Sequence, residues 1–187
     1  MTNCLILTHA FVKENEVHKL EPLNFALKHW RYNNPDSYII LAGHGLRPNV
    51  ENCDYVHWEE TINDKDINVG HPRLCNIAYD HATEKGFTKI LKSRSDSIHL
   101  IKNIADYSDT LLKDKQMLIT QQTTIDRPQM GDLFLYGNLN FIKQCWNINT
   151  WYPTNTGVTS LANNFMSVCE EENWHDACIN NLSFVNI

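Results

Sequence analysis

The order of its predicted strands and helices makes this chain an α/β protein, with a mostly parallel central sheet between layers of helices. Short apolar runs alternate with longer segments whose apolar residues recur at helical spacing, as they do in β-α-β units. The chain has 187 residues, of which 42% are hydrophobic and 20% are charged. This length and composition suit one domain with a substantial core, so we expect a single domain over residues 1–187, alone or within a longer protein.

Six apolar runs of strand length predict the sheet. They span residues 4–9, 37–42, 55–58, 87–92, 116–120 and 132–137. Turn-forming glycines follow two of these runs, at Gly43-His44-Gly45 and at Gly137, and we expect the strands to stop there.

Six further segments predict the helices. They span residues 14–31, 73–85, 98–112, 140–146, 160–169 and 174–180. Pro22 interrupts the first pattern, and Gly86 is the expected stop of the second. In the third, Ile101, Ile104 and Leu111 fall on one predicted apolar face.

Charge and cysteine content exclude several classes of protein. The formal net charge is −6, whereas nucleic-acid binding needs a clustered basic surface, so no nucleic-acid partner is expected. The six cysteines form no CxxC pair and are expected to be buried free thiols in a reducing compartment. No apolar stretch approaches the about 20 residues of a membrane span. We therefore expect a cytoplasmic protein without a membrane span.

The segment Lys92-Ser93-Arg94-Ser95-Asp96-Ser97 is the strongest candidate for a binding site, because it follows directly on a predicted strand. Ligands of α/β sheets bind at the carboxyl ends of the strands. The cations suit a phosphate group and the carboxylate suits a divalent metal. The side chains of Lys92 and Arg94 share one side of an extended strand, so both could face the ligand. A structural salt bridge from Arg94 to Asp96 or to another acid is the open alternative.

This arrangement resembles the nucleotide-binding half of GT-A-type glycosyltransferases, which is a Rossmann-like three-layer sandwich. More narrowly, residues 92–96 resemble the K-x-R-S-D segment of WavE-type lipopolysaccharide-synthesis glycosyltransferases and of related domains in large viruses. Arg73 on the preceding helix and the run from Asp132 to Gly137 match further parts of that pattern. The resemblance implies transfer of a sugar from a nucleotide-diphosphate donor to a hydroxyl group of a glycan or glycoprotein acceptor.

The resemblance also implies roles for individual residues. The donor would be bound by Thr8, His9, Arg73, Lys92, Arg94 and Ser95. Asp96 would bind Mn²⁺ or Mg²⁺, and Asp132 would be the general base of an inverting transfer. Each role has a structural alternative: a helix cap for Asp96, a solvated helix end for Arg73, a buried histidine for His9 and a loop-holding acid for Asp132.

Two other functions remain open at this point. Ser95-Asp96-Ser97 holds one carboxylate where the usual GT-A metal motif has two, and residues 156–163 contain no glutamate. Both departures favour a non-catalytic module that binds a nucleotide-sugar or a glycan. A nucleotidyltransferase would usually carry a glycine-rich loop after the first strand, and residues 8–12 contain no glycine. The phosphate loops GxGxxG and GxxxxGK[ST] are absent as well.

Overall fold

The structure, a computed structural model, describes residues 3–12, 14–60, 67–120, 130, 133–147 and 157–185. The strands are β1 (Cys4–Val12), β2 (Tyr38–Gly45), β3 (Tyr55–Glu59), β4 (Lys89–Arg94), β5 (Met117–Thr120), β6 (Phe134–Asn138) and β7 (Leu182–Val185). The helices are the 3-10 helix η1 (Glu14–Lys19), α1 (Leu20–Asn33), α2 (Ile67–Glu84), α3 (Ile104–Leu112), α4 (Leu139–Cys145), α5 (Gly157–Cys169) and α6 (Trp174–Asn181).

All of these strands join one seven-stranded sheet with the order β3-β2-β1-β4-β6-β5-β7. β6 is antiparallel to both of its neighbours, and the other pairs are parallel. The mostly parallel α/β sheet expected from the sequence is therefore confirmed. The strand order reverses between β1 and β4, because β2 and β3 lie on one side of β1 and the later strands lie on the other.

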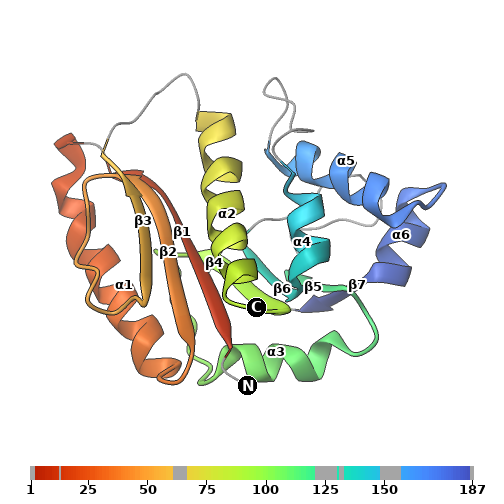
Figure 1. The fold of residues 1–187 in the computed structure, drawn as a ribbon, viewed down its shortest axis with the longest axis horizontal. Helices are drawn as coiled ribbons and strands as arrows, with labels where there is room; N and C mark the ends of the chain where they lie inside the picture. The colour runs from red at the N-terminus through yellow and green to blue at the C-terminus, as the bar shows by residue number, and fades with distance from the viewer. Residues whose placement is uncertain are drawn as a thin grey trace.

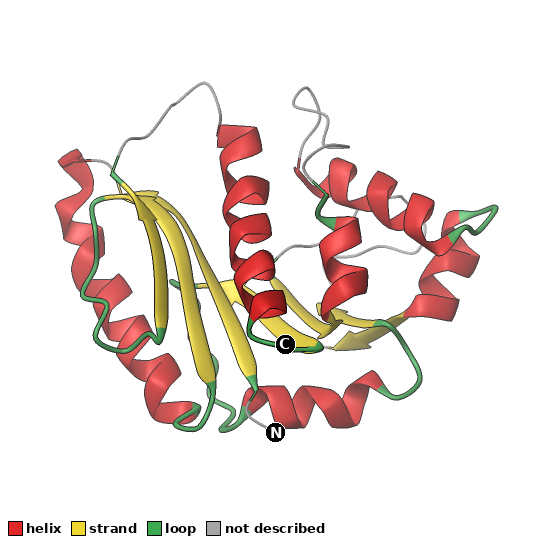
Figure 2. Ribbon diagram, viewed as in Figure 1, coloured by secondary structure: helices red, strands yellow, loops and turns green. Residues whose placement is uncertain are grey.

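Helices cover both faces of the sheet and complete a three-layer sandwich (Figures 1 and 2). Successive strand residues point to opposite faces. Ile6 of β1 and Ile90 of β4 therefore pack with α2, α4, α5 and α6, while Leu7 and Leu91 pack with α1 and α3. Burial on both faces explains why the central strands are continuously apolar rather than alternating.

Several predicted element ends differ from the structure, and for the start of α3 the structure shows the physical reason. α3 begins at Ile104 rather than at residue 98, after Asn103 in a left-handed conformation (φ 50°). The preceding loop is held by α1: Trp30 Nε1 donates to the carbonyl of Ser97 at 2.8 Å, and Asn33 Nδ2 donates to that of His99 at 3.2 Å. These carbonyl groups are thus bonded to side chains of α1 instead of to the backbone of a helix.

α2 also begins earlier than predicted, at Ile67 rather than at Arg73, and it includes Pro72. β7, which follows α6 directly and pairs with β5, was not predicted.

Four of the cysteines, Cys4, Cys75, Cys145 and Cys178, are buried, and the other two are partly buried. All six cysteines are described and none forms a disulfide. Burial raises the pKa of Cys4 and Cys53 to about 12, so these thiols stay protonated near neutral pH. Among the described residues, no helix is both long enough and apolar enough to cross a bilayer.

Candidate functional site

β4 ends at Arg94 beside β1, where the strand order reverses, and this is the position where open α/β sheets bind ligands. β1 continues past Thr8 to Val12, so the first strand does not stop at residue 9 as predicted. Thr8 of β1 lies opposite Arg94 of β4. The backbone N–H of Ser95 donates to the carbonyl of Thr8 at 3.0 Å, so the chain leaving β4 is fastened to β1. The register of these two strands therefore brings Thr8, Arg94, Ser95 and Asp96 together.

Arg94 and Asp96 form a bidentate ion pair at this edge. Nε donates to Oδ1 at 2.9 Å, and Nη2 donates to Oδ2 at 2.6 Å. The two side chains are 48% and 40% exposed, so solvent reaches both. An ion pair this exposed contributes little to stability, which leaves both groups able to exchange partners with a ligand. The alternative role of Asp96 as a helix cap does not apply, because α3 begins only at Ile104.

Lys92 is placed differently from Arg94, although both belong to β4. Lys92 is fully buried, and its Nζ lies 4.8 Å from the ring centroid of Trp146, just after α4. His71 of α2 packs against the same indole ring at a centroid distance of 5.5 Å. The Lys92 ammonium group is thus enclosed under Trp146, whereas the guanidinium of Arg94 reaches solvent.

A second charged cluster lies where β3 ends and α2 begins. Arg73 Nη1 donates to Glu59 Oε1 at 2.5 Å, and Nη2 contacts the other carboxylate oxygen. His57 Nε2 lies 3.0 Å from Glu59 Oε1. The hydrogen bonds from Arg73, with a smaller contribution from His57, lower the pKa of Glu59 to about 2. Arg73 is therefore half of an ion pair in this structure rather than a solvated helix end.

His44 at the end of β2 and the indole ring of Trp58 on β3 extend this cluster. Burial lowers the pKa of His44, while Glu59 opposes and Arg73 reinforces that shift, so the three side chains share one electrostatic environment. The Trp58 ring covers Gly43, and its Nε1 donates to the carbonyl of Gly45 at 2.8 Å.

Sequence reasoning missed Glu59, His57 and His44 as candidate residues. The same observation that selected residues 92–97 could have found Glu59, because it directly follows the strand predicted at 55–58.

These contacts do not test the function of any predicted site residue, and for two of those residues the side chain is not described. His9 pairs with Gly43 of β2, but its side chain lies outside the part of the chain that is described. Asp132 lies outside the described residues altogether. Their roles at the donor and as general base stay predictions.

The described residues could hold a divalent cation together with a bound phosphate ligand, but they form no metal site made of protein side chains alone. Within the described ranges, no group of three histidine, cysteine, aspartate or glutamate side chains could hold a metal ion. Asp96 is a single accessible carboxylate. Mg²⁺ commonly binds through one or two carboxylates together with substrate phosphates and water. Such a cation could therefore be held by Asp96 and a diphosphate.

Comparison with solved structures identifies the fold. No protein-family model matches the sequence, and no match was found among curated proteins. A "putative nucleotide-diphospho-sugar transferase" from Desulfovibrio desulfuricans superposes with a TM-score of 0.60 at 7% identity, covering 100% of this chain and 80% of the other. The bifunctional IspDF from Campylobacter jejuni superposes with a TM-score of 0.51 at 13% identity, and this chain spans 50% of its length. The chain therefore has a nucleotide-diphospho-sugar transferase-like fold.

Proposed function

We propose that this chain is a glycosyltransferase domain, which transfers a sugar from a nucleotide-diphosphate donor to a hydroxyl group of a glycan acceptor. The observation that supports the proposal is the meeting of Thr8, Arg94, Ser95 and Asp96 at the point where strand order reverses. The fold, like that of a nucleotide-diphospho-sugar transferase, agrees with such a donor. The K-x-R-S-D pattern of residues 92–96 favours the WavE-type branch and hence a glycan acceptor.

The exposed pair of Arg94 and Asp96 would separate when the donor binds. Arg94 exchanges the carboxylate of Asp96 for a phosphate, which its guanidinium can also hold through two hydrogen bonds. Asp96 would then be able to hold Mn²⁺ or Mg²⁺, which would supply positive charge to the diphosphate leaving group. Because each exchange releases the other residue, phosphate and metal should bind cooperatively.

The acceptor hydroxyl group must lose its proton as it attacks the anomeric carbon. Asp132 is proposed as the general base that accepts this proton. Its sequence position supports the role, since it stands two residues before β6, which pairs with β4 beside the proposed donor site.

Donor hydrolysis tests this proposal most directly, because water can replace the acceptor hydroxyl group. In a panel of nucleotide-sugars, we expect one donor to release its nucleoside diphosphate in the presence of Mn²⁺. Asp96→Ala should abolish the metal-dependent part of this release. Asp114→Ala is the matched control, because Asp114 lies between α3 and β5 and its side chain is 82% exposed.

A non-catalytic nucleotide-sugar-binding module is the second candidate. Asp96 is the one carboxylate of Ser95-Asp96-Ser97, and this favours binding without turnover. Nucleotide-sugars that bind in calorimetry, but never turn over even with glycan acceptors added, would establish the module and contradict the enzyme. Equal binding by Asp96→Ala with and without Mn²⁺ would contradict the role of Asp96 in holding the metal.

A further inference from the structure

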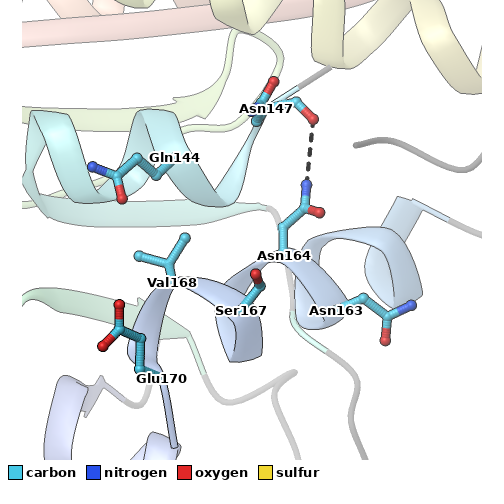
Figure 3. A pocket seen from close by; sticks show the side chains of 7 residues that line it. All are labelled: Gln144, Asn147, Asn163, Asn164, Ser167, Val168 and Glu170. Atoms are coloured by element: carbon cyan, nitrogen blue, oxygen red, sulfur yellow. Dashed lines mark hydrogen bonds between the residues drawn. The ribbon is translucent and has the colours of Figure 1, made fainter. Parts of the chain in front are cut away.

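A polar groove lies between α4 and α5, apart from the two charged clusters (Figure 3). It encloses about 430 Å³, a volume within the usual range of small-ligand sites. The polar residues that line this carboxamide groove are Gln144, Asn147, Asn163, Asn164, Ser167 and Glu170.

The chemistry of the groove suits a ligand with many hydroxyl groups. A carboxamide offers both donors and an acceptor, as a hydroxyl group does, so four of them can match either role of a sugar hydroxyl. The lining includes one carboxylate, Glu170, and no cation. A phosphate or other anion would therefore be repelled, whereas a neutral saccharide would not.

The groove combines one fixed carboxamide, Asn164, with two others, Gln144 and Asn163, whose side chains make no hydrogen bond within the described part of the chain. Asn164 is 6% exposed, and its Nδ2 donates to the carbonyl groups of Cys145 at 3.0 Å and Asn147 at 3.4 Å. These bonds tie α5 to the end of α4 and fix the orientation of the amide. Gln144, Asn163 and Ser167 are exposed, and within the described part of the chain their side chains make no hydrogen bond.

The groove is connected to the proposed donor site through Trp146. Asn147 directly follows Trp146, whose ring covers Lys92 Nζ near the carboxyl end of β4. Asn76 of α2 donates to the Trp146 carbonyl at 2.5 Å and holds this junction in place. A saccharide in the groove would thus lie beside the end of α4, from which Trp146 reaches Lys92 of β4.

We propose that the carboxamide groove binds a neutral oligosaccharide and holds the acceptor glycan of the transfer. The assignment as acceptor rests on the proposed glycosyltransferase function. The proposal that the groove binds a saccharide rests on the groove alone. An experiment can therefore contradict the acceptor role without contradicting saccharide binding.

Binding measurements on the whole chain test the groove. The probes are cellotetraose, maltotetraose, β-1,4-galactotetraose and tri-N-acetylchitotriose, each followed by saturation-transfer NMR and titration. We expect one of them to bind, and the double variant Gln144→Leu with Asn163→Leu to bind it roughly tenfold more weakly, since each lost hydrogen bond reduces affinity several-fold. Both side chains are exposed, so the variant should fold. Gln116→Leu, at an exposed amide directly before β5, is the control and should retain binding.

The affinity for uridine and guanosine diphosphates with Mn²⁺ is measured on the same proteins and should be equal in all of them. Nucleotide binding without any saccharide signal, or with a signal that the double variant retains, would overturn the groove assignment and leave the proposed function standing. A saccharide signal that the double variant loses, in a protein that binds no nucleotide diphosphate, would overturn the proposed function and support a saccharide site in the groove.

Discussion

The two arginines that the sequence assigned to the donor, Arg73 and Arg94, are each paired with a carboxylate of the chain itself, but in different surroundings. Asp96 is 40% exposed and has Arg94 as its bidentate partner. Glu59 is 24% exposed and has both Arg73 and His57 as partners. The better enclosed pair is the harder one to separate. We therefore infer that Arg94 exchanges partners on ligand binding and that Arg73 and Glu59 stay together and position the start of α2.

The acid stability of the protein should depend on Glu59. Its folded-state pKa of about 2 lies below the ordinary value of 4.5, so the ionised carboxylate stabilises the fold above about pH 4.5. This contribution is lost as the pH falls from 4.5 toward 2. Glu59→Gln should therefore lower the Tm near neutral pH, and the difference from the parent protein should shrink through that window.

Thermal unfolding followed by circular dichroism at a series of pH values measures this effect. Glu51→Gln is the matched control, because Glu51 is exposed and its side chain forms no ion pair among the described residues. A Tm difference that stays constant from neutral to acid pH would contradict a stabilising Glu59 carboxylate.

Asp132 gives a prediction about rate rather than stability. Asp132→Asn keeps the size of the side chain but removes the basic oxygen. A general base contributes about 10²–10⁴ in rate, so transfer should slow by that factor while donor affinity stays unchanged. Turnover and calorimetry on the same preparation check both points. A variant with a lower Tm and undiminished turnover would show instead that Asp132 is structural.

At the scale of elements, local patterns predicted the existence of helices and strands better than their ends. The central strands were predictable because long apolar runs reflect burial on both faces of the sheet. The start of α3 was not, because hydrogen bonds from Trp30 and Asn33 of α1 determine it, and no local pattern reports such distant partners. β7 has four residues and gains its partner only through β5, so its short sequence carried too little signal.

Two strand glycines should tolerate alanine differently. At Gly43 an added Cβ would overlap the Trp58 ring, which is a side chain. At Gly137 it would overlap the backbone of Gln116 and Met117 in the neighbouring strand region. We expect Gly43→Ala to cost about 1–3 kcal/mol, as overpacking does, and Gly137→Ala to cost more, because backbone cannot move aside.

The free energies of urea unfolding, measured for each glycine variant with and without Trp58→Leu, separate the two cases. Gly43→Ala should cost markedly less in a Trp58→Leu background, since the smaller side chain removes the overlap. Gly137→Ala should cost the same in either background. Equal costs for Gly43→Ala with and without Trp58 would mean that the ring does not set the requirement for glycine.

At the scale of the whole molecule, the sequence predicted one half of the candidate site. Arg94 and Asp96 are two residues apart, so a single polar segment was enough to find them. Their position beside Thr8 depends on the pairing of β1 with β4, and the contact of Arg73 with Glu59 depends on how α2 packs beside β3. Such contacts between distant segments follow from topology, which local periodicity does not encode.

Donor binding should stabilise the whole fold, because the proposed site joins the two parts of the sheet. β3, β2 and β1 lie on one side of the reversal, and β4, β6, β5 and β7 lie on the other. A diphosphate held between the ends of β1 and β4 binds only the folded state, and at 100 times its Kd it adds about 2.7 kcal/mol. For a domain of this size, that corresponds to a rise in Tm of roughly 5–10 °C.

Differential scanning fluorimetry with uridine or guanosine diphosphate and Mn²⁺ measures this rise, and hydrogen exchange locates it. Backbone amides near Thr8 and near Arg94 should both exchange more slowly, because one ligand contacts both strand ends. Uridine or guanosine alone, without the diphosphate, should shift the Tm much less, and Asp96→Ala should lose the part of the shift that depends on Mn²⁺. Slower exchange confined to β2 and β3 would move the donor site to the cluster around Glu59 and Arg73, and would contradict a site at the reversal of strand order.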